Sequence, residues 1–167
     1  MFVFGLDLAG KSTLVQQLKK GVFISTSPTL TTDVQKITFG DLQIRVFDMA
    51  GQLRFRGEWL QYLGSHIKAL VFVVDSAQPN RFPEAKMELD RILTDERSSN
   101  LPLLFCANKA DLENSVPYET INESFKLGDI SNRRVKLLKV SALTRMGVLG
   151  VFDWLGTMLL ADREEFS

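Results

Sequence analysis

The sequence has few residues of the kinds on which several common sites depend. Its 167 residues include one cysteine, Cys106, and one histidine, His66. A single cysteine excludes a disulfide framework and a multi-thiolate metal site, and it is typical of a reducing compartment. The single histidine excludes a metal site built on several imidazoles.

A membrane span and a strongly charged surface are also missing. The longest uninterrupted apolar run covers residues 69–74, far short of the roughly 20 residues that cross a membrane. The 20 basic and 20 acidic residues cancel, so no overall positive field favours nucleic acid. The sequence shows no basic n-region, no glycine at position 2 and no terminal cysteine. We therefore expect a cytoplasmic protein, since the sequence as given carries no signal-peptide or lipidation motif. A longer or lipidated N-terminus and peripheral contact with a membrane both stay open.

The pattern that is present predicts a folded α/β protein. Hydrophobic residues make up 45% of the chain, and the mean hydropathy of +0.02 excludes a disordered chain. The length fits one domain, residues 1–167, and a monomer. Short apolar runs alternate with segments of helical period, which predicts a mostly parallel sheet of about six strands flanked by about five helices.

The expected elements follow from these runs and from the glycine and proline positions. Gly40-Asp41 predicts a two-residue hairpin turn, which gives the one antiparallel pair, and Gly21 is expected to end the first helix. Residues 135–140 are mixed in character, which favours an edge strand. We expect strands at residues 1–4, 34–39, 42–47, 69–74, 101–107 and 135–140, and helices at 11–20, 82–93, 117–128 and 149–159.

The strongest local signal lies between the first expected strand and helix. Residues 5–12 read GLDLAGKS and match the phosphate-binding pattern G-x-x-x-x-G-K-[ST]. Glycines let backbone N–H groups surround phosphates, and the helix N-terminus adds a positive dipole. Lys11 would reach the β- and γ-phosphates and the Ser12 hydroxyl would bind Mg²⁺. The nucleotide contacts assigned here are Asp7, Leu8, Ala9, Gly10, Lys11, Ser12 and Thr13.

A second segment, Asp48-Met49-Ala50-Gly51-Gln52, follows an expected strand. Asp48 is placed to hold the metal through water. Gly51 would bring its N–H to the γ-phosphate, where a Cβ would crowd it. Gln52 would orient the attacking water, so the catalytic residues predicted are Gln52, Lys11 and Gly51.

A third segment, Asn108-Lys109-Ala110-Asp111, predicts the choice of base. The Asp111 carboxylate accepts hydrogen bonds from N1–H and the exocyclic amine of guanine, donors that adenine lacks. Asn108 would join neighbouring loops, and the Lys109 stem would cover one face of the base. The loop of Ser141, Ala142 and Leu143 would offer the Ala142 N–H to the guanine oxygen.

With these three segments in order, the sequence resembles the Ras-like small GTPases, and the Arf (ADP-ribosylation factor) branch most closely. The resemblance covers nearly the whole chain and implies a P-loop G domain. It assigns Thr29 to switch I, where it would close over Mg²⁺ and the γ-phosphate, and residues 49–57 to switch II. Without that alignment, Thr31 and Thr32 compete with Thr29. The segments that carry the resemblance are GLDLAGKST, Pro28-Thr29, FDMAGQ with Trp59, VFVVDS, ANKADL and FDWL.

The sequence departs from the Arf pattern in switch I. Thr31 and Thr32 stand where the family usually has Gly-Phe. That phenylalanine belongs to a hydrophobic trio that binds effectors, whose other members correspond to Phe47 and Tyr62. The family's N-terminal amphipathic helix is not in this sequence, so its membrane-docking mechanism is not carried over.

The resemblance implies a GTP/GDP switch that uses Mg²⁺ and hydrolyses GTP slowly. The Asp7 carboxylate would lie near the γ-phosphate and slow intrinsic hydrolysis; alternatively, it only caps the adjacent turn. Expected partners are an exchange factor, a GTPase-activating protein and effectors, all acting through switch I and switch II, in membrane-associated processes such as trafficking. Two alternatives remain: a GTP-bound interaction module with little hydrolysis, and an ATP phosphotransferase, which the segment 108–111 argues against.

Two basic groups also allow more than one interpretation. Arg54 and Arg56 have three alternative interpretations: an internal arginine finger, a contact with a partner, or side chains that are exposed to solvent. Arg133, Arg134, Lys136 and Lys139 would form a solvated face or touch a membrane.

Overall fold

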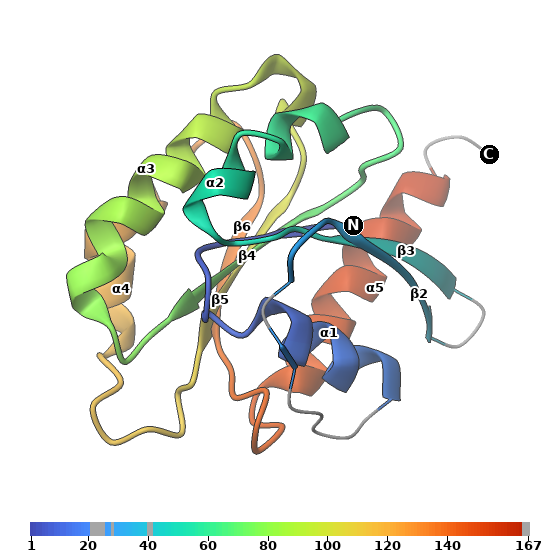
Figure 1. The fold of residues 1–167 in the computed structure, drawn as a ribbon. Helices are drawn as coiled ribbons and strands as arrows, with labels where there is room; N and C mark the ends of the chain where they lie inside the picture. The colour runs from blue at the N-terminus through green and yellow to red at the C-terminus, as the bar shows by residue number, and fades with distance from the viewer. Residues whose placement is uncertain (21–25, 28, 40–41, 165–167) are drawn as a thin grey trace.

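A six-stranded sheet forms the centre of the protein. The computed structural model describes residues 1–20, 26–27, 29–39 and 42–164. The strands lie in the order β2-β3-β1-β4-β5-β6, and only β2 and β3 pair antiparallel (Figure 1). This confirms the predicted α/β fold with β6 at an edge. The strands are β1 Phe2–Phe4, β2 Asp33–Phe39, β3 Leu42–Asp48, β4 Leu70–Asp75, β5 Leu103–Asn108 and β6 Val135–Lys139.

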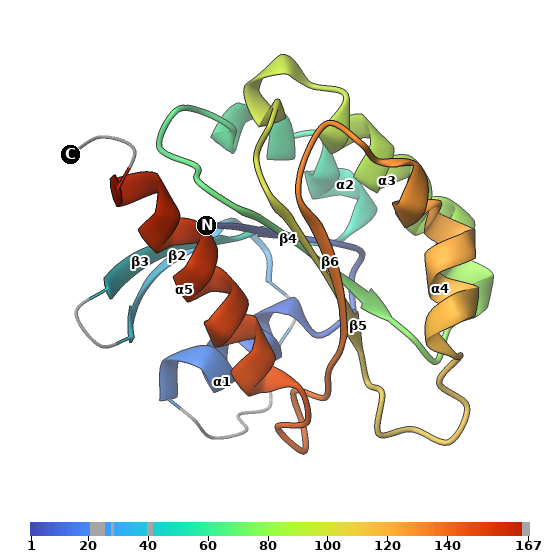
Figure 2. The ribbon, with the colours of Figure 1, turned by 180° about the vertical axis from the view of Figure 1, so that it is seen from behind.

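Helices cover both faces of the sheet. Helices α1 and α5 lie together on one face, whereas α2, α3 and α4 lie on the other (Figures 1 and 2). The α-helices are α1 Lys11–Lys20, α2 Leu53–Arg56, α3 Phe82–Leu93, α4 Tyr118–Phe125 and α5 Val148–Glu164. Short 3₁₀ helices span η1 Trp59–Tyr62, η2 Pro79–Arg81, η3 Glu96–Ser98 and η4 Leu127–Asp129.

The central strands β1, β4 and β5 are apolar except for the polar residues that end β4 and β5, because helices bury both of their faces. In β1, Phe2 and Phe4 pack toward α3 and α4, whereas Val3 packs toward α1 and α5. The same alternation places Phe72 and Val71 of β4 on opposite faces. Continuous apolar runs are typical of parallel strands that are covered on both sides.

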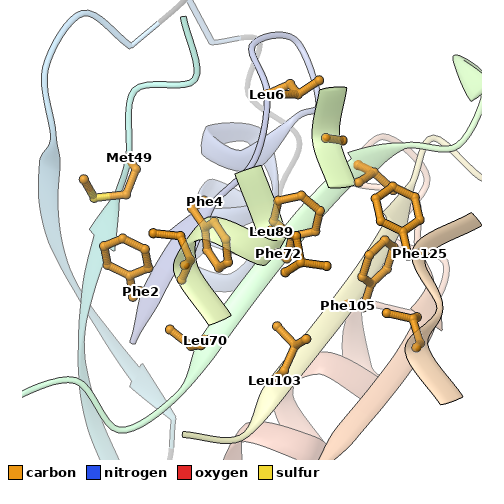
Figure 3. Packing of buried hydrophobic residues seen from close by; sticks show 14 of the residues in the cluster. Phe2, Phe4, Leu6, Met49, Leu70, Phe72, Leu89, Leu103, Phe105 and Phe125 are labelled. Carbon is orange, nitrogen blue, oxygen red and sulfur yellow. The ribbon is translucent and has the colours of Figure 1, made fainter. Parts of the chain in front are cut away.

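Aromatic rings fill the core beneath α3 and α4. The ring of Phe125 in α4 lies 4.7 Å from that of Phe105, 5.1 Å from Phe82 and 6.2 Å from Phe72, measured between centroids (Figure 3). Such contacts between aromatic rings stabilise the fold by more than the burial of their apolar area alone. Phe125 therefore attaches α4 to the sheet.

Three predicted boundaries differ from the structure by two residues or more, one of them the end of α5, which continues to Glu164 instead of ending at residue 159. Helix α4 ends at Phe125 rather than near Gly128, because Lys126 adopts a left-handed conformation with φ 50°. Strand β5 begins at Leu103 rather than at residue 101, after Pro102, which has no N–H to donate to a neighbouring strand. The predicted turn at Gly40-Asp41 and the helix stop at Gly21 lie outside the described residues.

The aromatic core generates a stability prediction. We expect Phe125→Ala to lower the free energy of unfolding by about 3–5 kcal/mol, because it leaves a cavity among three rings. The control Met87→Ala changes a side chain on α3 that is 74% exposed, and should cost no more than about 0.5 kcal/mol. Denaturant midpoints measure both, and equal losses would contradict the packing described.

Candidate nucleotide-binding site

The carboxyl ends of the parallel strands bring the predicted segments to one edge of the sheet. The phosphate loop follows β1, Asp48 ends β3, Asn108 ends β5, and Ser141 comes shortly after β6. Ligands of open α/β sheets bind at this edge. Two adjoining pockets of about 210 Å³ each lie here and share Gly10, Thr13 and Lys109.

The phosphate loop has the backbone conformation that its glycines predict. Gly10 has φ +91°, and a Cβ there would overlap the Asn108 side-chain nitrogen. Leu8 also has a positive φ, 63°, with its side chain exposed. Left-handed residues within a loop turn successive N–H groups toward one point, which makes an anion-binding concavity. The loop residues 7–13 other than Ala9 line the first pocket.

Lys11 places a buried positive charge in this pocket. Its Nζ donates to the Leu6 carbonyl at 2.8 Å, and the residue is almost wholly buried. Burial lowers the pKa of the Lys11 ammonium to about 8, against the opposing attraction of Asp48 and Asp7. A cation held out of water in this way is stabilised by an anion, which phosphate supplies.

The Asp48 carboxyl is also buried, and its charge is opposite to that of Lys11. Burial raises the pKa of its carboxyl to about 6, although a hydrogen bond from Ser12 and the charge of Lys11 oppose the rise. Its Oδ1 is buried and has no hydrogen-bond partner among the described residues. An unpartnered buried oxygen of this kind is suited to a cation or to a water bound to one.

The Ser12 and Thr29 hydroxyl groups meet beside this acid. Their oxygens are 2.8 Å apart, although the residues come from α1 and from the segment that precedes β2. Thr32 instead points its hydroxyl to the Met49 sulfur at 3.7 Å, and Thr31 is exposed. The structure thus brings Thr29, and not its two rivals, to Ser12.

These oxygen donors fit Mg²⁺. The described chain contains no group of three His, Cys, Asp or Glu that could hold a metal by itself. Mg²⁺ commonly takes one or two protein oxygens and completes its shell with water and substrate phosphates. The Ser12 and Thr29 hydroxyls offer two such oxygens, and the unpartnered Asp48 Oδ1 is suited to act through a water.

Gly51 packs against the phosphate loop so closely that no other residue would fit. Its carbonyl accepts the Asp7 N–H at 3.0 Å, and a Cβ would lie 2.6 Å from the Leu6 carbonyl carbon. Gln52 lines the same pocket and accepts a hydrogen bond from Arg54 Nε at 3.2 Å. The predicted catalytic residues Lys11, Gly51 and Gln52 therefore share one pocket.

Asn108 connects the phosphate loop with the second pocket. Its Nδ2 donates to the Ala9 carbonyl at 2.9 Å, and its Oδ1 accepts the Ala142 N–H at 3.0 Å. The Ala142 amide is thus already engaged, so a guanine oxygen would share it or bind the neighbouring Leu143 amide. The second pocket is lined by Gly10, Thr13, Asn108, Lys109, Asp111, Leu112, Ser141, Ala142 and Leu143.

Lys109 is held across the edge of this pocket. It has φ 61°, and its Nζ forms an ion pair with Asp75 Oδ2 at 2.6 Å. Asp75 ends β4 and was not assigned a role from sequence. Its position directly after an apolar strand is the signal that would have indicated it. The ion pair fixes the Lys109 ammonium beside the second pocket, which Lys109 lines.

Arg56 corrects the expectation that this arginine is solvated or faces a partner. It is 2% exposed, and its Nε donates to the Gly51 carbonyl at 2.8 Å. Its guanidinium also pairs with Asp7, Glu84 and Glu88. A buried guanidinium with this many partners cannot extend as a finger. Arg54, in contrast, is exposed and stacks on Phe55 at 4.6 Å.

The basic cluster near β6 also makes more hydrogen bonds within the protein than expected. Arg133 donates to the carbonyls of Leu93 and Ser98 at 3.0 Å each, and Lys139 donates to the Val116 carbonyl at 3.2 Å. These side chains satisfy carbonyl groups at the ends of other elements. They do not form one free charged face. No helix in the described part of the chain is long and apolar enough to cross a membrane.

Gln17 is a site residue that sequence reasoning missed. It is buried on α1, and its Nε2 donates to the Ala142 carbonyl at 2.7 Å. The contact joins the helix behind the phosphate loop to the loop of the second pocket, across 125 residues. Its only sequence signal was a polar residue on the apolar face of a short helix.

The fold and the site are those of a P-loop nucleotide-binding domain, and comparisons with known proteins identify which kind. The sequence model of the ADP-ribosylation factor family matches residues 1–159. ADP-ribosylation factor F of Dictyostelium discoideum is 38% identical over 158 residues, covering 93% of this chain and 82% of that protein. ADP-ribosylation factor-like protein 1 of Drosophila melanogaster is 32% identical over 159 residues, covering 95% and 88%.

A solved structure agrees with these relatives. The Arl6 (BBS3) small GTPase of Trypanosoma brucei, with the nucleotide analogue GppNp bound, superposes with a TM-score of 0.86 at 29% identity. The match covers 93% of this chain and 94% of that one. The chain belongs to the ADP-ribosylation factor family. It is an Arf-like GTP-binding molecular switch and a GTPase, and the alternative of a binding module without hydrolysis is not favoured.

Gln17 supplies a prediction about nucleotide retention. Gln17→Met leaves the buried Ala142 carbonyl without its donor, which costs about 1–3 kcal/mol if the loop stays in place. We expect the loop to loosen and GDP to dissociate about tenfold faster. Gln16→Met is the matched control, because Gln16 bonds Gln35 of β2 and not the pocket. Equal rates of fluorescent GDP release from the two variants would contradict the assigned role.

Proposed function

We propose that this protein is a Mg²⁺-dependent GTP/GDP switch whose nucleotide lies across the two adjoining pockets. The observation that carries the proposal is the meeting of the Ser12 and Thr29 hydroxyls, 2.8 Å apart, beside the buried acid Asp48. Lys11 and the phosphate-loop amides hold the β- and γ-phosphates. Ser12 and Thr29, with Asp48 acting through water, would hold Mg²⁺, which would neutralise phosphate charge during transfer.

The reaction is an in-line attack of water on the γ-phosphate. The Gln52 amide accepts a hydrogen bond from Arg54, which leaves its N–H₂ group to orient water. The Lys11 ammonium stabilises charge on the phosphate oxygens as the bond to the leaving GDP breaks. The roles of Lys11, Gly51 and Gln52 are thus electrostatic and positional rather than covalent.

Switching depends on contacts that exist only with the γ-phosphate. Thr29 precedes β2 and Gly51 follows β3, so both flank the same antiparallel pair. The γ-phosphate would hold both segments at the phosphate loop, and hydrolysis would release them. Their release would change the surface offered to a partner.

Guanine selectivity comes from the second pocket. Asp111 lines it with Ser141, Ala142 and Leu143, and its carboxylate accepts the two donors on the guanine edge. An adenine would leave that carboxylate without these partners. Lys109, fixed by Asp75, covers one face of the base.

The switch segments also present a surface suited to protein partners. Phe47 and Tyr62 lie with their rings 6.5 Å apart and are half-buried. Leu30, Val34 and Leu53 nearby in the chain are exposed apolar side chains. Apolar and aromatic groups of this kind anchor interfaces. An exchange factor, a GTPase-activating protein and effectors would bind here, in a process peripheral to a membrane.

The role of Gln52 is tested by its replacement. We expect Gln52→Leu to slow single-turnover GTP hydrolysis about tenfold or more, because the leucine cannot orient water, and to leave GTP affinity within about twofold. Gln61→Leu makes the same change at an exposed position in η1, and should hydrolyse GTP normally. If both variants keep the wild-type rate, Gln52 has no part in the reaction.

The metal site is tested by comparing neighbouring threonines. Thr29→Ala should speed GTP release about fivefold in Mg²⁺, the loss of one modest interaction. Thr31→Ala, at an exposed position outside the site, should not. Chelation with EDTA should speed release from the wild type and remove the difference between the variants. A difference that persists in EDTA would show that Thr29 acts without the metal.

A further inference from the structure

The Asp7 carboxylate lies in the phosphate loop between two guanidinium groups. Its Oδ1 is 2.7 Å from Arg81 Nη2 and 3.3 Å from Arg56 Nη2. Arg81 Nη1 also donates to the Asp7 carbonyl at 3.1 Å. Although partial burial opposes it, the hydrogen bond and charge of Arg81 hold the pKa of the Asp7 carboxyl below its usual value. Asp7 is therefore ionised and paired.

This pairing reduces a charge repulsion that GTP would meet in the pocket. GDP would not meet it, because it has no γ-phosphate. Asp7 lines the phosphate pocket together with Lys11, Gly51 and Gln52. A γ-phosphate entering that pocket brings negative charge close to the carboxylate. Like charges a few ångströms apart in a partly buried site repel strongly if nothing compensates them. A neutralised carboxylate removes most of that penalty.

Arg81 is placed to neutralise Asp7 without taking part in the switches. It ends η2, between β4 and α3, and its side chain is 26% exposed. Its Nε is 3.2 Å from Glu84 Oε2, which orients the guanidinium toward the phosphate loop. Arg56 differs because it is buried in α2 and bonds the Gly51 carbonyl. Among the described residues of the phosphate loop, Arg81 forms hydrogen bonds with Asp7 alone.

We infer that Arg81 is a positioning residue that makes the phosphate loop tolerate GTP. It holds the Asp7 carboxylate toward α3 and fixes the Asp7 carbonyl, so that the γ-phosphate meets N–H groups and Lys11 instead of an unpaired charge. The inference rests on the proposed nucleotide site. It predicts that Arg81 sets the relative affinity for GTP and GDP, and that this effect requires the charge of Asp7.

A purely structural role would leave a different signature. If Arg81 only attached α3 to the loop, its loss would weaken both nucleotides alike, and removal of the Asp7 charge would not repair the loss. The ratio of the two affinities separates these cases, because a general loosening of the fold cancels in the ratio.

The experiment measures that ratio in a double-mutant cycle. Wild type, Arg81→Met, Asp7→Asn and the double variant are competed against fluorescent GDP with GDP or GppNHp, in Mg²⁺. We expect Arg81→Met to reduce the GppNHp-to-GDP affinity ratio about tenfold. The double variant should match Asp7→Asn within about twofold. Arg81→Lys, which keeps the charge, should recover most of the wild-type ratio.

Controls keep each outcome decisive. Lys86→Ala breaks a different α3 ion pair, with Asp90, and should leave the ratio unchanged. An unchanged ratio in Arg81→Met overturns the inference, as does a fall that Asp7→Asn does not repair. If Arg81→Met folds poorly, the double variant is compared with Asp7→Asn alone. A tenfold difference between their GppNHp-to-GDP affinity ratios overturns the inference. Failure of the wild type to bind either nucleotide would instead contradict the proposed function.

Discussion

The buried ammonium of Lys11 is the constraint around which the rest of the site is arranged. It lies beneath a loop whose residues curve around it, with one carbonyl partner and the buried acid Asp48 nearby. A charge held this far from water destabilises the fold unless an anion accompanies it. The proposed phosphate site thus follows from the fold itself: a mostly parallel sheet brings the loop, the acid and the Ser12 and Thr29 hydroxyls to one edge, where a phosphate would complete their charge balance.

Side chains that cross between loops make this edge a single unit. Asn108 bonds the phosphate loop on one side and the loop after β6 on the other. Arg56 and Arg81 tie the phosphate loop to α3. In the proposed switch, Gly51 would sense the γ-phosphate, and its carbonyl accepts a hydrogen bond from Arg56 of this network. This contact would couple nucleotide state to the switch surface. Away from this edge, aromatic packing holds the sheet and α4 together.

The local parts of this account could be predicted from the sequence, whereas the long-range parts could not. Strands, helices and the segments at residues 5–12, 48–52 and 108–111 carry their signal in neighbouring residues. Arg56 was misjudged because its burial depends on Glu84 and Glu88, which are about thirty residues away in the chain. Gln17 and Arg81 were missed for the same reason, since each acts on a segment more than seventy residues away. Pairing between polar groups that are distant in the chain produces no periodic pattern in the sequence, so it cannot be predicted from neighbouring residues.

The most direct test of the account is to identify the nucleotide that the protein keeps. Purified protein is loaded with a mixture of GTP and ATP in Mg²⁺, incubated for hours and separated from free nucleotide, and the bound species is determined by chromatography. The account predicts that the protein retains only guanine nucleotide, and that bound GTP is converted to bound GDP with release of one phosphate. Retention of ATP, or of no nucleotide, would contradict it.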